Sequence, residues 1–318
     1  MPAEASQGHA GHAHAVSAET NRRRLALALG LIVGFMAGEV AVGILAHSLA
    51  LLSDAAHMVT DAGAIGLSLV ALALAARPAG GNLTFGLKRA EILSAQANGA
   101  TLLVLAGLIV YEAIRRLIEP PQVQGWAVVG VALGGVAVNL LATWLLAKAN
   151  RENMAVEGSF QHIITDLYAF IGTLVAGIVI VTTGFVRADP IASLAVAALM
   201  LRASYGLLRD SGRVLLEASP RGMSASEIGQ ALAAHPQVAE VHDLHVWEIA
   251  TGFPSLSAHV LVRPGDDCHG IRRELERMID ERFGVDHTTL QVDHLGRGVI
   301  PRSGRLVSEC DQSETSLP

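Results

Sequence analysis

Two pairs of metal-ligating side chains with the same spacing occur in long apolar segments of this sequence. His57 and Asp61 are four residues apart, and His162 and Asp166 repeat the spacing. On a helix, residues four apart lie on one face, one turn from each other. Two imidazole nitrogens and two carboxylate oxygens supply four ligands, the number and type that tetrahedral Zn²⁺ takes at about 2.0–2.2 Å. The spacing therefore predicts one metal site shared by two helices.

A single pair of this kind has a second interpretation. A His and an Asp in a membrane helix also form internal ion pairs or helix–helix hydrogen bonds. The duplication favours the metal site, because two unrelated structural uses do not require one pattern. Asp54 lies seven residues before Asp61, either as a carboxylate on an access path or as a cap at the start of the helix. For Asn98 and Asn139 we expect interhelical hydrogen bonds.

The elements that position these residues are predicted to be membrane helices. Hydrophobic residues make up 51% of the 318 residues and charged residues 16%, whereas an average soluble domain carries about 25% charged residues. A membrane helix needs roughly 20 mostly apolar residues in contact with lipid. Six segments satisfy this requirement, at about 25–46, 49–76, 91–114, 123–147, 159–186 and 190–208. The net charge of −6 argues against a nucleic-acid partner.

Lys and Arg residues concentrate in the loops on one side of these six spans. They are Arg22, Arg23, Arg24, Arg77, Lys88, Arg89, Lys148, Arg151, Arg209 and Arg213. Arg115, Arg116 and Arg187 lie on the opposite side and weaken the bias without reversing it. The positive-inside rule therefore predicts that both termini are cytoplasmic. We expect an integral protein of a bacterial inner membrane.

A small α/β domain is predicted after the last span. Helical periodicity over 224–235 and 267–283, and strand-like alternation over 238–249, 255–262 and 288–295, give the order α-β-β-α-β of a ferredoxin-like domain. Ser224, followed by Glu227, is the expected N-cap of the first of these helices. The predicted organisation is a flexible tail with histidines (1–21), a six-helix membrane domain (22–213), the α/β domain (214–296) and a disordered tail (297–318).

Four stretches of the sequence resemble the cation diffusion facilitator family of metal/proton antiporters. They are ALLSDAAHMVTD at Ala50–Asp61, EGSFQHIITD at Glu157–Asp166, Thr84-Phe85-Gly86 with Arg89-Ala90-Glu91, and VHDLHVW at Val241–Trp247. The resemblance covers about residues 22–295, and the two H-x-x-x-D pairs are similar to those of the zinc-transporting branch. It implies six spans, a homodimer and a cytoplasmic metallochaperone-like domain. It also implies alternating access, with H⁺ exchanged for metal.

The resemblance further implies a regulatory zinc site in the C-terminal domain, with His242, His259, His269 and Asp293 as ligands. This sequence has Gln291 where some relatives have His, so that site would be weaker or rearranged. Many relatives also carry a His-rich loop between spans four and five, and here the segment 148–158 has no His. The N-terminal His9, His12 and His14 either collect metal in its place or are incidental.

The prediction from these observations is proton-coupled efflux of Zn²⁺, with Cd²⁺ and Co²⁺ as alternative cargo. The rivals are an intramembrane zinc hydrolase, a metal sensor and a channel. A hydrolase needs an open metal position and a general base, and the H-E-x-x-H pattern is absent. We therefore expect no enzymatic activity, whereas a sensor or a channel is separated from a carrier only by measuring coupled flux.

Overall fold

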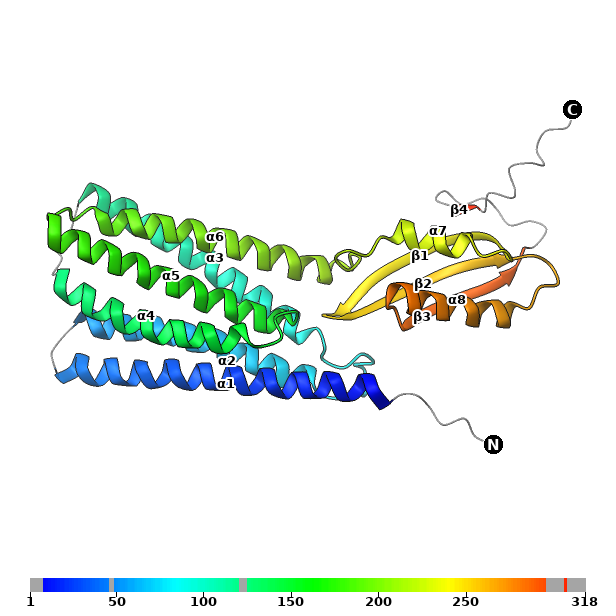
Figure 1. Ribbon diagram of the computed structural model, residues 1–318, viewed down its shortest axis with the longest axis horizontal. Coiled ribbons are helices and arrows are strands. Elements are labelled where there is room, and N and C mark those ends of the chain that lie inside the picture. Colours follow the sequence, from blue (N-terminus) through cyan, green and yellow to red (C-terminus); the bar gives the residue numbers. More distant parts are fainter. Residues whose placement is uncertain (1–7, 46–48, 120–124, 296–305, 308–318) are drawn as a thin grey trace, which may run out of the picture. The chain divides into compact units, whose positions relative to one another are not determined.

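The computed structural model divides the chain into two compact units, Met1–Gly212 and Arg213–Pro318. The backbone is described for residues 8–45, 49–119, 125–295 and 306–307. Side chains are described for the same residues except 8–18, 39, 42–45, 49–57, 60, 125–128, 131 and 306–307. The first unit is helical, and the second combines helices with a sheet (Figure 1).

Six long helices make up the described part of the first unit. They are α1 (Gly8–Leu45), α2 (Leu49–Ala75), α3 (Ala90–Ile118), α4 (Gly125–Ala147), α5 (Met154–Thr183) and α6 (Ala188–Leu215), and Figure 1 shows them running side by side. Their bounds differ from the predicted spans mainly where a helix continues past its apolar stretch. α1 differs most, because it begins at Gly8, inside the segment predicted as a flexible tail. That segment is rich in Ala, the best helix former.

The helices of the first unit have the composition of membrane spans. Length and hydropathy mark α3, α5 and α6 as able to cross a membrane. The described parts of α2 and α4 contribute shorter apolar segments, Asp61–Ala75 and Ala132–Ala147. This search covered the described residues, and the side chains at the starts of α2 and α4 lie outside them. The predicted helical membrane domain is confirmed.

Two separate apolar clusters hold these helices together. One joins α1, α2, α4 and α5, and its members include the buried Leu25, Ile65, Leu146 and Ile163. The other joins α3 to α6 through the buried Leu102, Ala106, Val196, Met200 and Leu207. Lipid tails are as apolar as these side chains, so close packing rather than removal from water stabilises such contacts. The fully buried members thus divide between the groups α1–α2–α4–α5 and α3–α6, and Ala169 of α5 also packs against the second cluster.

The second unit has the predicted α-β-β-α-β order. α7 (Ala225–Ala233) precedes β1 (Val238–Ala250) and β2 (Phe253–Val262), and α8 (Cys268–Phe283) crosses over to β3 (His287–His294). The described strands form one sheet in the order β3-β2-β1-β4, where β4 is Leu306–Val307. β1 and β2 are antiparallel, and β2 and β3 are parallel. The rest of the predicted disordered tail, 297–318, lies outside the described residues.

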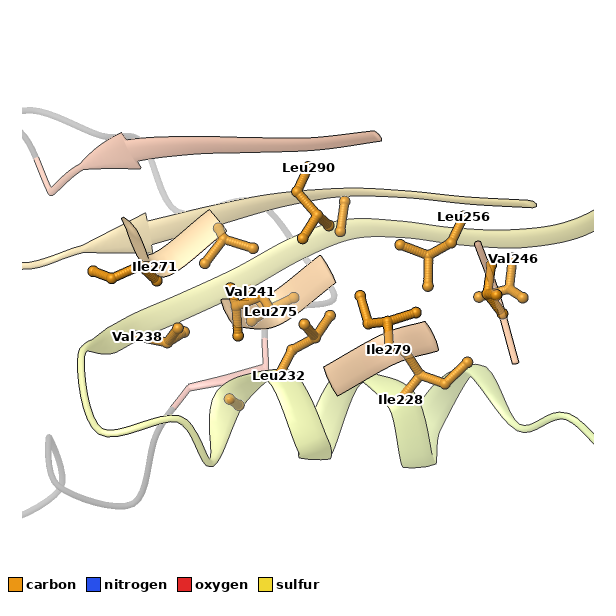
Figure 2. Packing of buried hydrophobic residues seen from close by; sticks show 14 of the residues in the cluster. Ile228, Leu232, Val238, Val241, Val246, Leu256, Ile271, Leu275, Ile279 and Leu290 are labelled. Carbon is orange, nitrogen blue, oxygen red and sulfur yellow. The ribbon is translucent and has the colours of Figure 1, made fainter. Parts of the chain in front are cut away.

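The core of this domain lies between its helices and one face of the sheet. Figure 2 shows Ile228 and Leu232 of α7 and Leu275 and Ile279 of α8 pointing toward strand side chains such as Leu256. Alternate residues of a strand point to opposite faces of its sheet. The strand residues between the core positions are therefore directed to the other face, which bears the histidines of β1 and β2.

Side chains cap both helices of this domain. Ser224 accepts a hydrogen bond from the Glu227 N–H, as predicted, and Asp267 accepts one from the His269 N–H at the start of α8. The backbone N–H of Gly270, with that of His269, lowers the pKa of the Asp267 carboxyl below its ordinary value. The carboxylate therefore stays ionised and keeps its capping role at neutral pH.

We expect Leu275→Ala to destabilise the C-terminal domain by about 2–5 kcal/mol, because it leaves a cavity in a closely packed core. Leu275 is completely buried at the centre of the cluster. Denaturant unfolding of the full-length protein, followed by the fluorescence of Trp247, measures the change. Arg277→Ala, an exposed substitution on the same helix, should leave the free energy of unfolding almost unchanged. Equal effects of the two substitutions would contradict the packing described here.

Candidate metal centre

α5 carries His162 and Asp166 into the interior of the first unit. The Asn153 side chain caps this helix by accepting hydrogen bonds from the N–H groups of Ala155 and Val156. Gly184 ends it in the left-handed conformation, with φ of 72°. Glycine adopts this conformation without a steric penalty. Between these two ends the helix is regular, so residues four apart share one face, as the sequence predicts.

Asp61, His162 and Asp166 form a buried cluster between α2 and α5. His162 Nε2 lies 3.0 Å from Asp61 Oδ1 and 3.8 Å from Asp166 Oδ2. The exposed fractions of the three residues are 3%, 0% and 6%, in chain order. One ligand atom from each lies within 4.8 Å of the others. Ligands of a tetrahedral zinc ion are about 3.4 Å apart, so small side-chain adjustments suffice for these three atoms to bind one ion.

Two buried polar atoms of this cluster lack a hydrogen-bond partner among the described residues. They are His162 Nδ1 and Asp166 Oδ2. An unsatisfied buried polar atom costs roughly 1–3 kcal/mol, and two buried carboxylates beside one imidazole leave an excess of negative charge. A divalent cation would accept electron pairs from the carboxylates and the imidazole and would neutralise this charge. The donor set therefore fits a metal ion better than it fits a purely structural hydrogen bond.

The structure brings together three of the four predicted transport ligands. His57 lies on α2, one turn before Asp61, but its side chain is outside the described residues, as is that of Asp54. The N-terminal His9, His12 and His14 lie on α1 with side chains that are likewise outside the description. The helical position of His57 keeps it on the face of α2 that carries Asp61.

A second group of metal-ligating side chains lies on the C-terminal domain. One ligand atom each from His242, Asp243 and His259 lies within 4.8 Å of the others. His242 of β1 pairs with His259 of β2 across the antiparallel ladder, with ring centroids 5.3 Å apart. The register shifts between His242 and His245, and within this bulge Asp243 has a φ of 51°. The bulge turns Asp243 toward the histidine pair, as bulges often re-aim side chains.

A cavity of about 450 Å³ opens beside this group. It is lined by Asp243, His245, Ser257, Ala258, His259, Thr289 and Gln291. His242 of this group has Glu240 as a neighbour. Its Nδ1 lies 3.3 Å from Glu240 Oε1, but the geometry is not that of a hydrogen bond. Asp243 and His259 thus face a space that is accessible to solvent and ions.

His269 and Asp293, the other two residues predicted for this site, do not join the group. His269 lies in the first turn of α8, and Asp293 Oδ2 accepts a hydrogen bond of 2.8 Å from Gln291 Nε2. Cys268 has a different neighbour, since its Sγ lies 3.5 Å from His294 Nε2. Among the described residues, the three-ligand group of this domain therefore contains two of the four predicted ligands together with Asp243.

Comparison with known families covers almost all of this architecture. Residues 25–216 match the cation efflux transmembrane domain, and residues 220–295 match the cation efflux protein cytoplasmic domain. The chain belongs to the cation efflux family. This cation efflux protein is accordingly a membrane transporter by family and not an enzyme, which removes the hydrolase interpretation.

Several curated bacterial proteins resemble this cation efflux protein along nearly their whole length. A cadmium, cobalt and zinc/H⁺-K⁺ antiporter of Bacillus subtilis is 36% identical over 288 residues, 89% of this chain and 92% of the relative. The zinc transporter ZitB of Escherichia coli is 36% identical over 306 residues, 92% of this chain and 97% of the relative. The metal cation efflux system protein CzcD of Cupriavidus metallidurans is 35% identical over 288 residues, 89% and 90% respectively.

Sequence reasoning missed two kinds of residue near these sites. The residue type of Asp243 is a sequence signal, because Asp tolerates the left-handed backbone conformation better than most residues. The β-bulge that contains it is not visible in the alternation of apolar and polar residues. Ser68 carries no spacing signal at all, although it hydrogen-bonds across three helices. The expected interhelical bond is found for Asn98, whereas Asn139 donates to the Gly135 carbonyl of its own helix.

We expect Asp61→Asn to weaken Zn²⁺ binding at the membrane cluster by at least about 100-fold. Replacing residues that merely orient metal ligands already costs 10–100-fold in affinity, and this substitution removes the charge of a ligand candidate. Competition with a zinc-sensitive dye, on protein in detergent, measures the affinity. Asp189→Asn is the matched control, because Asp189 lies in the first turn of α6 and pairs with Arg116. Wild-type affinity in Asp61→Asn would remove Asp61 from the site.

Proposed function

We propose that this cation efflux protein exports Zn²⁺ from the cytoplasm in exchange for protons, with Cd²⁺ and Co²⁺ as alternative cargo. The observation that carries the proposal is the position of His162 Nε2, 3.0 Å from Asp61 Oδ1 and 3.8 Å from Asp166 Oδ2 inside the helix bundle. The printed names of the relatives, which include zinc, cadmium and cobalt, support the choice of metals.

The ligand chemistry selects the class of cargo. We take His57 as the fourth ligand, from its place one turn before Asp61 on α2. Two imidazoles and two carboxylates suit Zn²⁺, and Co²⁺ accepts similar ligands. Mg²⁺ and Ca²⁺ prefer six or more oxygen ligands, usually with water among them. A closed site with two nitrogen donors therefore discriminates against these abundant cations.

Proton exchange follows from competition for one atom. His162 Nε2 and Asp61 Oδ1 lie within hydrogen-bond distance, so the two groups can share a proton. A metal ion needs the lone pair of that nitrogen and an ionised carboxylate, so binding displaces the proton. When the site faces the outside, protons compete the metal away. Proton influx down its gradient then returns the carrier to its inward-facing state by alternating access.

The proposal includes the orientation of the chain in the membrane and its assembly into a dimer. The Lys and Arg bias of the loops supports a cytoplasmic location of both termini and of the C-terminal domain. A bacterial inner membrane fits the sources of the relatives. We infer a homodimer from the membership of the family and from the match of residues 220–295 to its cytoplasmic domain.

We also propose a regulatory metal site in the C-terminal domain. Its ligands in this chain are His242, Asp243 and His259, supported by their mutual approach within 4.8 Å beside an open cavity. His269 and Asp293 remain candidates from the family pattern, and each lies outside this group. Three donors next to a solvent-accessible cavity leave coordination positions for water. Such a site binds less tightly than the membrane site, as a sensor of cytoplasmic metal requires.

In proteoliposomes with a pH gradient, we expect Zn²⁺ uptake coupled to proton movement in the opposite direction. Asp166→Ala and His57→Ala should each abolish it, because each removes one of the four proposed ligands. Asp189→Asn should transport at the wild-type rate. Flux without proton movement would indicate a channel, and metal binding without flux would indicate a sensor. Full proton-driven transport by Asp166→Ala would overturn the assignment of the site.

We expect His259→Ala to lose one weakly bound Zn²⁺ per chain while the membrane site stays occupied. Equilibrium dialysis followed by metal analysis counts the ions. His269→Ala and Asp293→Ala separate the two ligand sets, since both should keep the full count if His242, Asp243 and His259 suffice. Loss of the same ion in His269→Ala would restore the ligand set implied by family resemblance.

A further inference from the structure

Ser68 of α2 is the centre of a hydrogen-bonded network that joins three helices. Its Oγ accepts a bond of 2.8 Å from Ser159 Oγ of α5 and one of 3.3 Å from Asn98 Nδ2 of α3. Ser94 Oγ, also of α3, lies 3.2 Å away. All four side chains are at most 2% exposed. Ser68 Oγ also donates a bond of 3.2 Å to the Ala64 carbonyl of its own helix. A hydroxyl offers one donor and two acceptor sites, so these bonds together use the full capacity of Ser68.

This network crosses the boundary between the two groups of helices. Ser68 and Ser159 belong to the group α1–α2–α4–α5, and Ser94 and Asn98 belong to the group α3–α6. α3 and α5 also approach closely at this level, because a Cβ on Gly158 would lie 3.2 Å from Asn98 Nδ2 and 3.4 Å from the Ala95 Cα. The two groups have separate apolar clusters. At this level the hydrogen bonds of Ser68 are the polar part of a close helix contact that also includes the backbones of Gly158 and Ala95.

The network also lies next to the metal cluster, toward one end of the bundle. Ser159 precedes His162 by three residues, or about 4.5 Å along the helix, and Ser68 follows Asp61 by seven, or about 10.5 Å. Both steps lead toward the end where α2 finishes and α3 and α5 begin. In the orientation of the proposed function this end faces the cytoplasm, so the inference rests on that proposal for its direction.

We propose that Ser68, Ser94, Asn98 and Ser159 form a latch that closes the passage between the metal site and the cytoplasm. It opens when the group α3–α6 moves away from α2 and α5. Neutral groups suit this role, because each of their hydrogen bonds is weak and water can replace it once the helices part. A carboxylate in the same place would bind the passing cation, whereas hydroxyl and amide groups let it go.

The latch is tested by the accessibility of a buried reporter cysteine at the same level. Ala95 is completely buried on α3, so Ala95→Cys, in a background with Cys268→Ser and Cys310→Ser, reacts with a water-soluble maleimide only when the helices part. The protein is held metal-free in lipid nanodiscs, which expose both membrane faces. Ser68→Ala and Ser159→Ala should each raise the labelling rate about threefold to fifteenfold, the range expected for one interhelical hydrogen bond.

Two comparisons separate a latch from general loosening of the bundle. The double variant Ser68→Ala/Ser159→Ala should label no faster than Ser68→Ala, because both substitutions remove the same bond. Ser211→Ala is the matched control and should change the rate less than twofold, since Ser211 is buried but bonds to Leu207 O of its own helix. If Ser68→Ala fails to fold, the labelling rates of Ser159→Ala and Ser94→Ala provide the test.

The result that overturns the latch is an unchanged labelling rate in well-folded Ser68→Ala and Ser159→Ala, or an equal increase in Ser211→Ala. Zn²⁺ affinity provides the second readout and should stay within twofold of the parent in Ser68→Ala. Loss of zinc binding with unchanged labelling would make Ser68 a ligand instead. Because labelling is measured without metal, a parent protein that binds no zinc would refute the proposed function and leave the latch standing.

Discussion

Two carboxylates and an imidazole inside an apolar helix bundle impose the constraint on which the rest of this structure depends. Charged groups at this depth are costly, and removing the partner of a buried charge costs roughly 3–5 kcal/mol. The close approach of His162 Nε2 and Asp61 Oδ1 reduces this cost. Under the proposed function a metal ion reduces it further by displacing the proton that these two groups share. The proposal therefore makes occupancy and protonation of the site alternatives.

Two kinds of contact hold the surrounding bundle together. Apolar side chains pack within the groups α1–α2–α4–α5 and α3–α6, whereas hydroxyl and amide groups meet between α2, α3 and α5. Apolar packing favours a single close fit, but weak hydrogen bonds can be remade with water. The described residues thus combine apolar packing within each group with a polar contact beside the metal cluster.

The helical period explains why much of the membrane site could be predicted from the sequence. Spacing alone placed His162 and Asp166 on one face, and the repeated pattern predicted their partner Asp61. Strand alternation likewise predicted the sheet of the C-terminal domain. The position of Asp243 could not be predicted, because a β-bulge depends on backbone register rather than on the pattern of apolar residues. Ser68 was equally hidden, since its side-chain partners come from two other helices, α3 and α5, and no local spacing encodes the mutual rotation of the three.

The most direct test of the central claim is to count the protons released when Zn²⁺ binds to the membrane site. Calorimetric titration in buffers of different ionisation enthalpy gives this number, and a His242→Ala/His259→Ala background isolates the membrane site. The account predicts that at least about one proton leaves per ion bound near neutral pH, and that His162→Ala abolishes both the binding and the release. Tight binding of Zn²⁺ that releases no proton would contradict it.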